Sequence, residues 1–242
     1  TAIKYGAYEK TATRGLSIIN IRAMEALSSY SQYLELIALI IGIIRYKEFK
    51  NHKFKYILYF LVYVVLNEFA AGVSYELFKI PNTLLYNIYI LIHFAFFLAW
   101  FHTLLASAFR KKIIKFFFIL YVSFWFVNAI FSGSIADNFL SYSFSLGTLL
   151  LIAAVAFYFV EMLSREVVLN ITQSPYFWVC FGILIYCVTY LPFYITLLFF
   201  IQENPIILSV VLFLINCIQY CCIAIAFIKA NRRTIEHPLE TN

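Results

Sequence analysis

Three ionisable side chains lie inside long apolar stretches of the chain. Glu35, Glu68 and His93 each stand within a run of hydrophobic residues. A charge at the centre of a bilayer costs roughly 2.5–3.5 kcal/mol on insertion scales, so such residues usually serve a purpose. Two carboxylates and an imidazole can bind a cation or an amine, or can share a proton. This set predicts a ligand site, with a hydrogen-bonded packing network as the alternative interpretation.

Other polar and aromatic side chains accompany these three. The amides of Asn67 and Asn87 lie close to Glu68 and His93 in sequence and complete the predicted ligand-binding set. A pocket wall or a solute path is the second prediction, and its candidates are Tyr89, Tyr186, Tyr190, Asn216 and Gln219. Helical spacing puts one row of side chains on a single face: Tyr86, Tyr89, His93, Phe97 and Trp100. The alternative for the tyrosines is bundle packing, and for the amides it is hydrogen bonding between helices.

The chain shows no catalytic, cofactor or metal motif. It lacks the His-Glu-x-x-His zinc motif, the Gly-x-Ser-x-Gly elbow and a phosphate-binding glycine loop. The two glutamates and His93 could hold a divalent metal, but the predicted spans contain no pair of His or carboxylate ligands at i, i+4 spacing to support this. All five cysteines fall in the last two apolar stretches, at Cys180, Cys187, Cys217, Cys221 and Cys222. Buried thiols usually pack as small apolar residues, with a redox or metal cluster as the alternative. We therefore expect a protein without enzymatic activity, cofactor or metal.

The composition decides which elements hold these residues. Hydrophobic residues make up 64% of the 242, and charged residues only 12%, against roughly 25% charged residues in soluble domains. A surface this apolar must be covered by lipid. Only helices and closed barrels satisfy every backbone group in hydrocarbon, and the apolar runs lack the alternation of barrel strands. The prediction is an all-α integral membrane protein, a bundle of seven transmembrane helices at 28–46, 54–77, 83–108, 113–133, 140–164, 175–201 and 205–229.

The connectors predict how the bundle is oriented. The basic residues of the connectors lie almost entirely on one side of the predicted spans. One side holds Arg45, Lys47, Lys50, Lys53, Lys55, Arg110, Lys111, Lys112, Lys115, Arg165, Lys229, Arg232 and Arg233, and the loops on the other side hold only Lys79. The positive-inside rule places the first group in the cytoplasm, the N-terminus outside and the C-terminus inside. We expect the inner or plasma membrane, with these cations facing anionic lipid headgroups rather than nucleic acid.

Three segments are predicted along the chain. Residues 24–229 form the transmembrane domain and residues 230–242 a cytoplasmic tail. Residues 1–23 carry basic residues that the rule would not place outside, and Met24 resembles a natural start, so this segment is an extension or cloning remnant, or an amphipathic arm on the membrane surface. A faint match of the second and third spans to the sixth and seventh, with Tyr63 opposite Tyr186, predicts a three-one-three repeat.

Three functions fit this architecture. The predicted polar cluster opens outward and the cytoplasmic loops are short, which favours a receptor-like sensory or regulatory subunit that binds a small ligand outside and signals to a partner. A small-solute or ion transporter is the second prediction and would use the repeat. A structural or pore-forming subunit of a membrane complex is the third. Each implies contact with membrane lipids and either a protein partner or a homo-oligomer.

Overall fold

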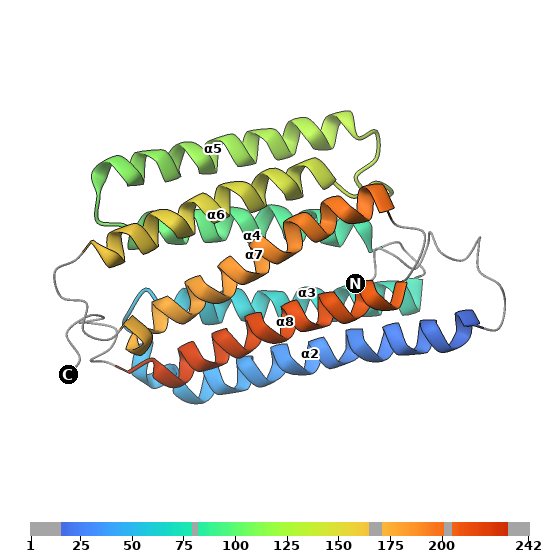
Figure 1. The fold of residues 1–242 in the computed structure, drawn as a ribbon, viewed down its shortest axis with the longest axis horizontal. Coiled ribbons are helices and arrows are strands. Elements are labelled where there is room, and N and C mark those ends of the chain that lie inside the picture. The colour runs from blue at the N-terminus through green and yellow to red at the C-terminus, as the bar shows by residue number, and fades with distance from the viewer. Residues whose placement is uncertain (1–15, 79–81, 165–170, 201–204, 232–242) are drawn as a thin grey trace. The chain divides into compact units, whose positions relative to one another are not determined.

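A computed structural model describes residues 16–78, 82–164, 171–200 and 205–231. These residues form seven α-helices and one short 3-10 helix, and no strand occurs among them (Figure 1). The helices are α2 (Leu16–Phe49), α3 (Lys55–Phe78), α4 (Thr83–Leu104), α5 (Ala108–Phe131), α6 (Ser141–Leu163), α7 (Pro175–Phe200) and α8 (Pro205–Lys229), and the 3-10 helix η2 (Ile171–Gln173) precedes α7. The all-helical prediction is confirmed. The first 15 residues, most of the C-terminal tail, Lys79 and Arg165 lie outside the described residues.

Two helix starts differ clearly from their predictions. The first span was predicted to begin at residue 28, but α2 begins at Leu16. The fourth span was predicted to begin at residue 113, but α5 begins at Ala108. Ser107 caps this helix, and its side-chain oxygen accepts a hydrogen bond from the Arg110 backbone N–H. Serine is among the preferred N-cap residues because it satisfies one of the unpaired N–H groups of the first turn. Hydropathy alone missed this turn because its side chains are basic.

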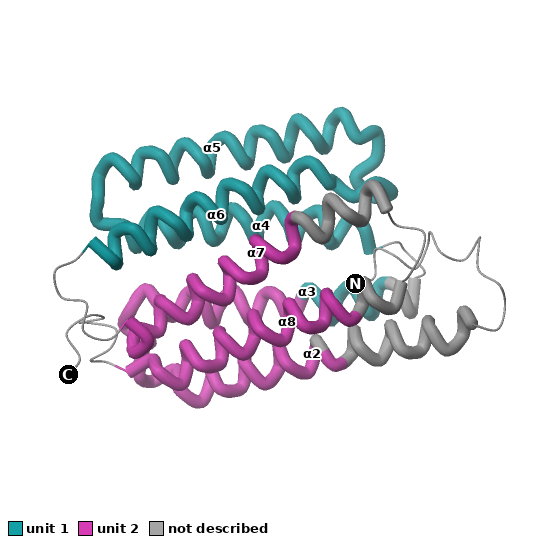
Figure 2. Tube along the Cα trace, viewed as in Figure 1, with its two compact units in different colours: residues 1–8, 67–165 teal, residues 9–66, 166–242 magenta. Residues whose placement is uncertain are grey.

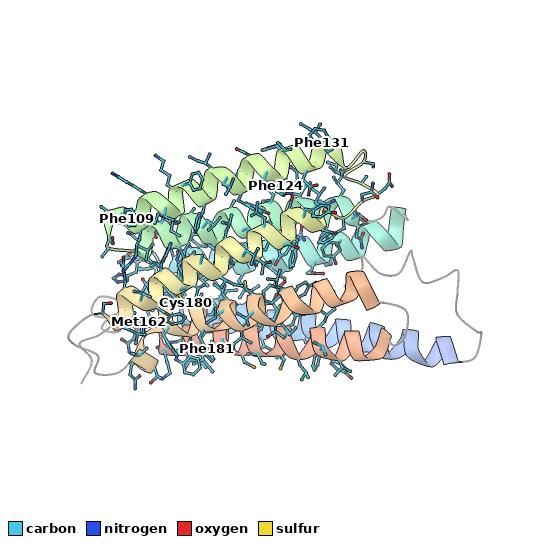
Figure 3. The ribbon with its side chains drawn as sticks, turned by 45° about the horizontal axis from the view of Figure 1, so that its top comes forward. Phe109, Phe124, Phe131, Met162, Cys180 and Phe181 are labelled. Carbon is cyan, nitrogen blue, oxygen red and sulfur yellow. The ribbon has the colours of Figure 1, made fainter. Side chains whose placement is uncertain are left out.

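Among the described residues, five helical segments are long and apolar enough to cross a membrane. These segments are Lys55–Ser74, Thr83–Leu104, Ala108–Phe131, Ser141–Leu163 and Val210–Lys229, and Pro175–Leu191 is a shorter apolar helix. Large side chains stay uncovered along them: Phe131 at the end of α5 is 84% exposed and Phe109 at its start 71% (Figure 3). Exposed aromatic surface of this extent is typical of helices surrounded by hydrocarbon. The structure therefore indicates a membrane-embedded helical protein.

The chain divides into two compact units, shown in different colours in Figure 2. The described part of unit 1 covers residues 67–78 and 82–164, and its core is made by α4, α5 and α6, which pack on one another. Phe94 of α4 lies at the centre, with its ring 5.4 Å from that of Tyr121 in α5 and 5.7 Å from that of Phe144 in α6. Gly147 of α6 lets the helices meet, because a Cβ there would lie 2.5 Å from the Phe94 ring.

Unit 2 contains α2, the start of α3, α7 and α8. Helix α8 packs against both α2 and α7. Four aromatic rings from all four helices meet at one end of the unit: those of Phe49, Phe54, Tyr176 and Phe227, with neighbouring centroids 5.4–5.7 Å apart. Since this cluster joins the end of α2, the start of α3, the start of α7 and the end of α8, α2 runs parallel to α8 and antiparallel to α7.

Most basic residues in the described part of each unit lie at one end, which we call its basic end; Arg22, near the start of α2, lies away from it. In unit 1 the basic end is the turn between α4 and α5, with Arg110 and the three lysines after it. In unit 2 it is the end that holds the aromatic cluster, with Arg45, the lysines of the α2–α3 turn and Lys229. The division into units does not follow a three-one-three order of spans, because α2 belongs with α7 and α8. The repeat stays a prediction.

Candidate functional site

Glu68 and Tyr86 are joined by a hydrogen bond inside unit 1. The Tyr86 hydroxyl donates to the Glu68 carboxylate, with 3.4 Å between the oxygens. Tyr86 is buried near the start of α4, and Glu68 is half-buried in the part of α3 that belongs to this unit. A carboxylate that is partly accessible and already faces a hydroxyl can accept a further donor. In the described part of unit 1, this pair joins an acid within one predicted span to a tyrosine within the next.

His93 lies one to two turns further along the same face of α4. Its Nδ1 is 3.1 Å from the Tyr89 hydroxyl, and the tautomer decides which of the two donates. The imidazole is buried, and its ring contacts those of Phe94 and Phe97 at about 5 Å. Glu68, Tyr86, Tyr89 and His93 are called the polar stripe below. It runs from near the start of α4 to the middle of the helix.

The same face of α4 becomes apolar beyond His93. Phe97 and Trp100 continue the row toward the basic end, and both are buried. The neighbouring face, which packs on α5 and α6, carries Phe94, Leu98 and Phe101 over the same length. The polar side chains on this face of α4 therefore lie in the half of the helix away from its basic end, while His102 and Thr103 lie near the basic end on other faces.

Asn87, predicted to bind ligand, is instead fully occupied in holding the α5–α6 loop. Its side-chain amide donates to the backbone oxygens of Ile135 and Asn138, at 2.8 and 2.9 Å. Its side-chain oxygen accepts from the Leu140 N–H at 3.0 Å, and the residue is completely buried. The backbone oxygen of Asn87 also accepts from the Trp125 indole at 3.1 Å. These bonds explain the amide as a structural group of unit 1.

The remaining predicted residues are spread over both units. Asn67 is half-buried beside Glu68 in α3. Glu35 is buried in α2, which belongs to unit 2, as do the other candidates for a pocket or path. Tyr186 and Tyr190 stack on one another in α7, with ring centroids 5.2 Å apart. In α8 the Gln219 side chain is buried and that of Asn216 half-buried. Of these residues, only Asn67 lies in the same unit as the polar stripe, next to Glu68 in the sequence. The others belong to unit 2.

Sequence reasoning left Tyr86 out of the ligand-binding set, although it named the row of α4 side chains to which Tyr86 belongs. A tyrosine one helical turn before Tyr89 and two before His93 was the available signal. The pairing with Glu68 could not be seen, because it depends on how α3 and α4 pack.

The basic end of unit 1 is closed by Glu161 of α6. Its carboxylate accepts from the backbone N–H groups of Ala106 and Ser107, at 2.7 and 3.0 Å. It also pairs with Arg110 at 3.2 Å. An anion at a helix N-terminus is favoured because the first N–H groups lack partners within the helix. The carboxylate thus fastens the end of α6 to the start of α5.

The basic end of unit 2 is closed in a similar way by Arg45. The guanidinium of Arg45 in α2 donates to the backbone oxygens of Ile228 and Ala230 at the end of α8, at 3.5 and 3.4 Å. Lys229 donates to the side-chain oxygen of Gln173 at 3.5 Å. Cations near the last carbonyls of a helix complement its dipole. In both units, a charged side chain therefore bonds the ends of two helices to each other at the basic end.

Among the described residues no three His, Cys, Asp or Glu side chains lie close enough together to hold a metal ion. Comparison with protein-family models, with curated proteins and with solved structures gives no match for this chain.

Proposed function

We propose that the chain spans the membrane seven times, with its N-terminus outside and its C-terminus in the cytoplasm. The arrangement of unit 2 supports this orientation, because Arg45, the α2–α3 lysines and Lys229 meet at the same end. In unit 1 the loop at the opposite end, residues 132–140, contains Asp137 and no lysine or arginine. Such asymmetry is what the positive-inside rule describes. The inner or plasma membrane is the proposed location.

Within this orientation, the protein acts as a sensory or regulatory subunit that binds a small ligand from the outer side. One observation carries this proposal: the face of α4 that bears the polar stripe holds Tyr86, Tyr89 and His93 in one half. Toward the basic end, the same face holds Phe97 and Trp100. A transporter needs polar groups along its whole path, whereas a sensor needs them only where the ligand binds. The bonds of Glu161 and Arg45 that close the basic ends favour the same choice. No enzymatic step is part of the proposal.

The chemistry of the polar stripe favours a small organic cation as ligand. The half-buried Glu68 carboxylate supplies a negative charge, and the ring of Tyr86 lies beside it. An ammonium group is attracted by a carboxylate and by the face of an aromatic ring. Both attractions grow stronger where water is excluded. A protonated primary amine, with its three donors, matches this combination of acceptor and ring.

Calorimetric titration of the detergent-solubilised protein with methylammonium tests the proposal. We expect binding, and we expect Glu68→Gln to weaken it at least about tenfold, since a hydrogen bond to a charged group contributes roughly 1.5–3 kcal/mol. Glu48→Gln is the matched control, because Glu48 is an exposed carboxylate at the basic end of α2. The Glu48→Gln variant should bind methylammonium with the wild-type affinity. Equal affinities in wild type and Glu68→Gln would remove the stripe as the ligand site.

A small-solute transporter is the second candidate, and the buried amide of Gln219 near the middle of α8 is the observation that favours it. Liposomes loaded with protein distinguish the two functions. Wild-type protein that moves radiolabelled methylammonium across the bilayer, with flux lost in Gln219→Leu, would replace the sensor by a transporter. A sensor also needs a partner or a second copy to receive its signal, so a stable monomer in mild detergent that neither recruits a protein nor moves solute would oppose it.

A further inference from the structure

The turn between α2 and α3 presents a dense group of exposed lysines. Lys47, Lys50 and Lys53 are all exposed, and Lys55 follows at the start of α3. Four successive backbone hydrogen bonds order the turn, from the His52 N–H to the Phe49 oxygen through to the Ile57 N–H to the Phe54 oxygen. The rings of Phe49 and Phe54 are completely buried on either side of it. The positive charges are therefore held on a fixed scaffold.

Three tyrosines lie immediately beside these lysines. The hydroxyls of Tyr46 in α2 and Tyr59 in α3 are 2.8 Å apart, and the Tyr59 ring also contacts that of Tyr56 at 6.2 Å. The Lys55 ammonium lies 5.6 Å from the centre of the Tyr56 ring. Tyr56 and Tyr59 are each about half exposed. Of two hydroxyls bonded to each other, one keeps its proton to donate elsewhere, so an accessible donor stands next to the cationic group.

The second basic group of the chain lacks this arrangement. At the start of α5, Arg110 is paired with Glu161 at 3.2 Å, which offsets its charge. The exposed side chains around Lys112 and Lys115 are the phenylalanines Phe109 and Phe116, which offer no hydroxyl. Both groups lie at basic ends, yet of the two only the α2–α3 turn combines several exposed lysines with tyrosine hydroxyls.

We propose that the α2–α3 turn, through Lys47, Lys50, Lys53 and the Tyr46–Tyr59 hydroxyl pair, binds the headgroup of an anionic phospholipid. The phosphate matches the lysine charges and accepts from the hydroxyl pair, while the apolar residues that continue α2 and α3 line the acyl chains. Tyrosine is enriched at the membrane–water interface because its ring is apolar and its hydroxyl is polar. A lysine near an anionic surface contributes roughly fivefold in affinity, so three together bind selectively. The site is independent of the ligand proposed for the polar stripe.

Native mass spectrometry of the full chain in detergent, titrated with phosphatidylglycerol or phosphatidylcholine, tests this site. We expect wild-type protein to retain phosphatidylglycerol in preference. The triple variant Lys47→Gln, Lys50→Gln and Lys53→Gln should weaken this binding at least about tenfold. The double variant Tyr46→Phe and Tyr59→Phe, which keeps every charge, should weaken it about threefold. The matched control triple variant Lys111→Gln, Lys112→Gln and Lys115→Gln removes the same charge from α5 and should change it less than about twofold.

Several outcomes would overturn the site. An equal loss in the two triple variants would mean diffuse attraction without a binding site. Unchanged binding in the tyrosine variant would mean that the lysines attract the lipid by charge alone, without a hydrogen bond from the hydroxyl pair to the headgroup. Equal retention of phosphatidylcholine would remove the selectivity, and displacement of the lipid by inorganic phosphate alone would make the ligand a soluble anion. All substituted positions lie at the surface or in surface turns, and the elution volume in size-exclusion chromatography confirms that each variant is folded.

Discussion

The two units hold their helices together with different chemistry. In unit 1, side chains reach across to backbone atoms: Asn87 fixes the α5–α6 loop, the Tyr121 hydroxyl donates to the Ile90 oxygen at 2.9 Å, and the Trp125 indole donates to Asn87. Both units also pack aromatic rings and bring helices together at glycines. A Cβ on Gly182 in α7 would lie 2.9 Å from Cys222 in α8, and one on Gly42 in α2 would lie 2.6 Å from Leu58 in α3. In the described part of unit 2, however, the side-chain bonds to the backbone of another α-helix come from Arg45 at the basic end.

This difference shows that a polar residue within a span has two distinct uses. The amide of Asn87 has its side-chain donors and its acceptor satisfied by one loop, which leaves it nothing for a ligand. Glu68 is half-buried and accepts from one hydroxyl, and thus keeps acceptor capacity. Both residues would destabilise the protein if their polar groups had no hydrogen-bond partner in hydrocarbon. What separates a packing residue from a candidate site is therefore the number of partners, rather than the depth at which the residue lies.

The largest effect is expected from Asn87→Ala, which tests whether unit 1 depends on its polar bonds. The change leaves two part-buried carbonyls and one buried N–H without this partner. The buried N–H costs about 1–3 kcal/mol and each lost bond to a carbonyl about 0.5–1.5 kcal/mol, so the free energy of unfolding should fall by about 2 kcal/mol or more. The measurement is denaturant unfolding in detergent, followed by tryptophan fluorescence. Asn51→Ala, at an exposed amide in the α2–α3 turn, is the control and should be silent. A loss under about 1 kcal/mol for Asn87→Ala would refute the contrast between the units.

The helices of this protein could be predicted from sequence, and the partners of its polar residues could not. Long apolar runs indicated where each helix lies, because bilayer thickness sets the length that a span needs. The start of α2 at Leu16 was not predicted, since the apolar run begins near residue 28. The start of α5 was missed since a capping serine, and not hydropathy, sets it. The role of Asn87 depends on a loop some fifty residues away in the chain, and the Glu68–Tyr86 pair depends on how α3 and α4 pack. Periodicity places residues on a face but does not say what that face meets.

The ion pair expected at the end of α6 illustrates the same limit. Glu161 and Arg165 are spaced for a bond within one helix, and the sequence predicts that pair. Arg165 lies outside the described residues, while the Glu161 carboxylate is bound to Arg110 and two backbone N–H groups of another helix. A helix N-terminus offers several unpaired donors at once, which no single neighbouring side chain does. Such a partner is invisible in local spacing.

Replacing a closely packed glycine by alanine should give the next largest loss of stability. In Gly147→Ala the new Cβ would lie 2.6 Å from Cγ of Phe94, an atom near the root of a ring that Tyr121 and Phe144 hold in place. Overpacking of this kind costs about 1–3 kcal/mol. Gly42→Ala meets the flexible end of Leu58 most closely and should cost less. Gly72→Ala, with nothing within 4 Å, is the control. Thermal midpoints measured in one detergent rank the three, and a greater loss for Gly42→Ala than for Gly147→Ala would reverse the argument.

A smaller effect is expected where each unit is closed at its basic end. Glu161→Ala removes the carboxylate that binds two backbone N–H groups at the N-terminus of α5 beside the capping Ser107, and the loss of a capping group typically costs about 0.5–2 kcal/mol. Arg45→Ala removes two longer bonds to the end of α8 and should cost about 0.3–1 kcal/mol. Hydrogen exchange of the backbone amides locates each effect, and we expect faster exchange at the start of α5 and at the end of α8, respectively. Uniform exchange changes over both units would show that these clamps are not local.

Removal of a single hydroxyl should give the smallest difference and the sharpest test of the comparison. Tyr121→Phe leaves its ring in place and deletes the buried bond to the Ile90 oxygen, which should cost about 1 kcal/mol. Tyr46→Phe deletes the exposed bond to Tyr59 and should leave the thermal midpoint unchanged in detergent without anionic lipid. Addition of phosphatidylglycerol separates them further, because the lipid should stabilise wild type and Tyr121→Phe by equal amounts and Tyr46→Phe by less. If Tyr46→Phe proved the more destabilised variant without lipid, hydroxyl bonds would matter more in unit 2 than in unit 1, contrary to the packing seen in each.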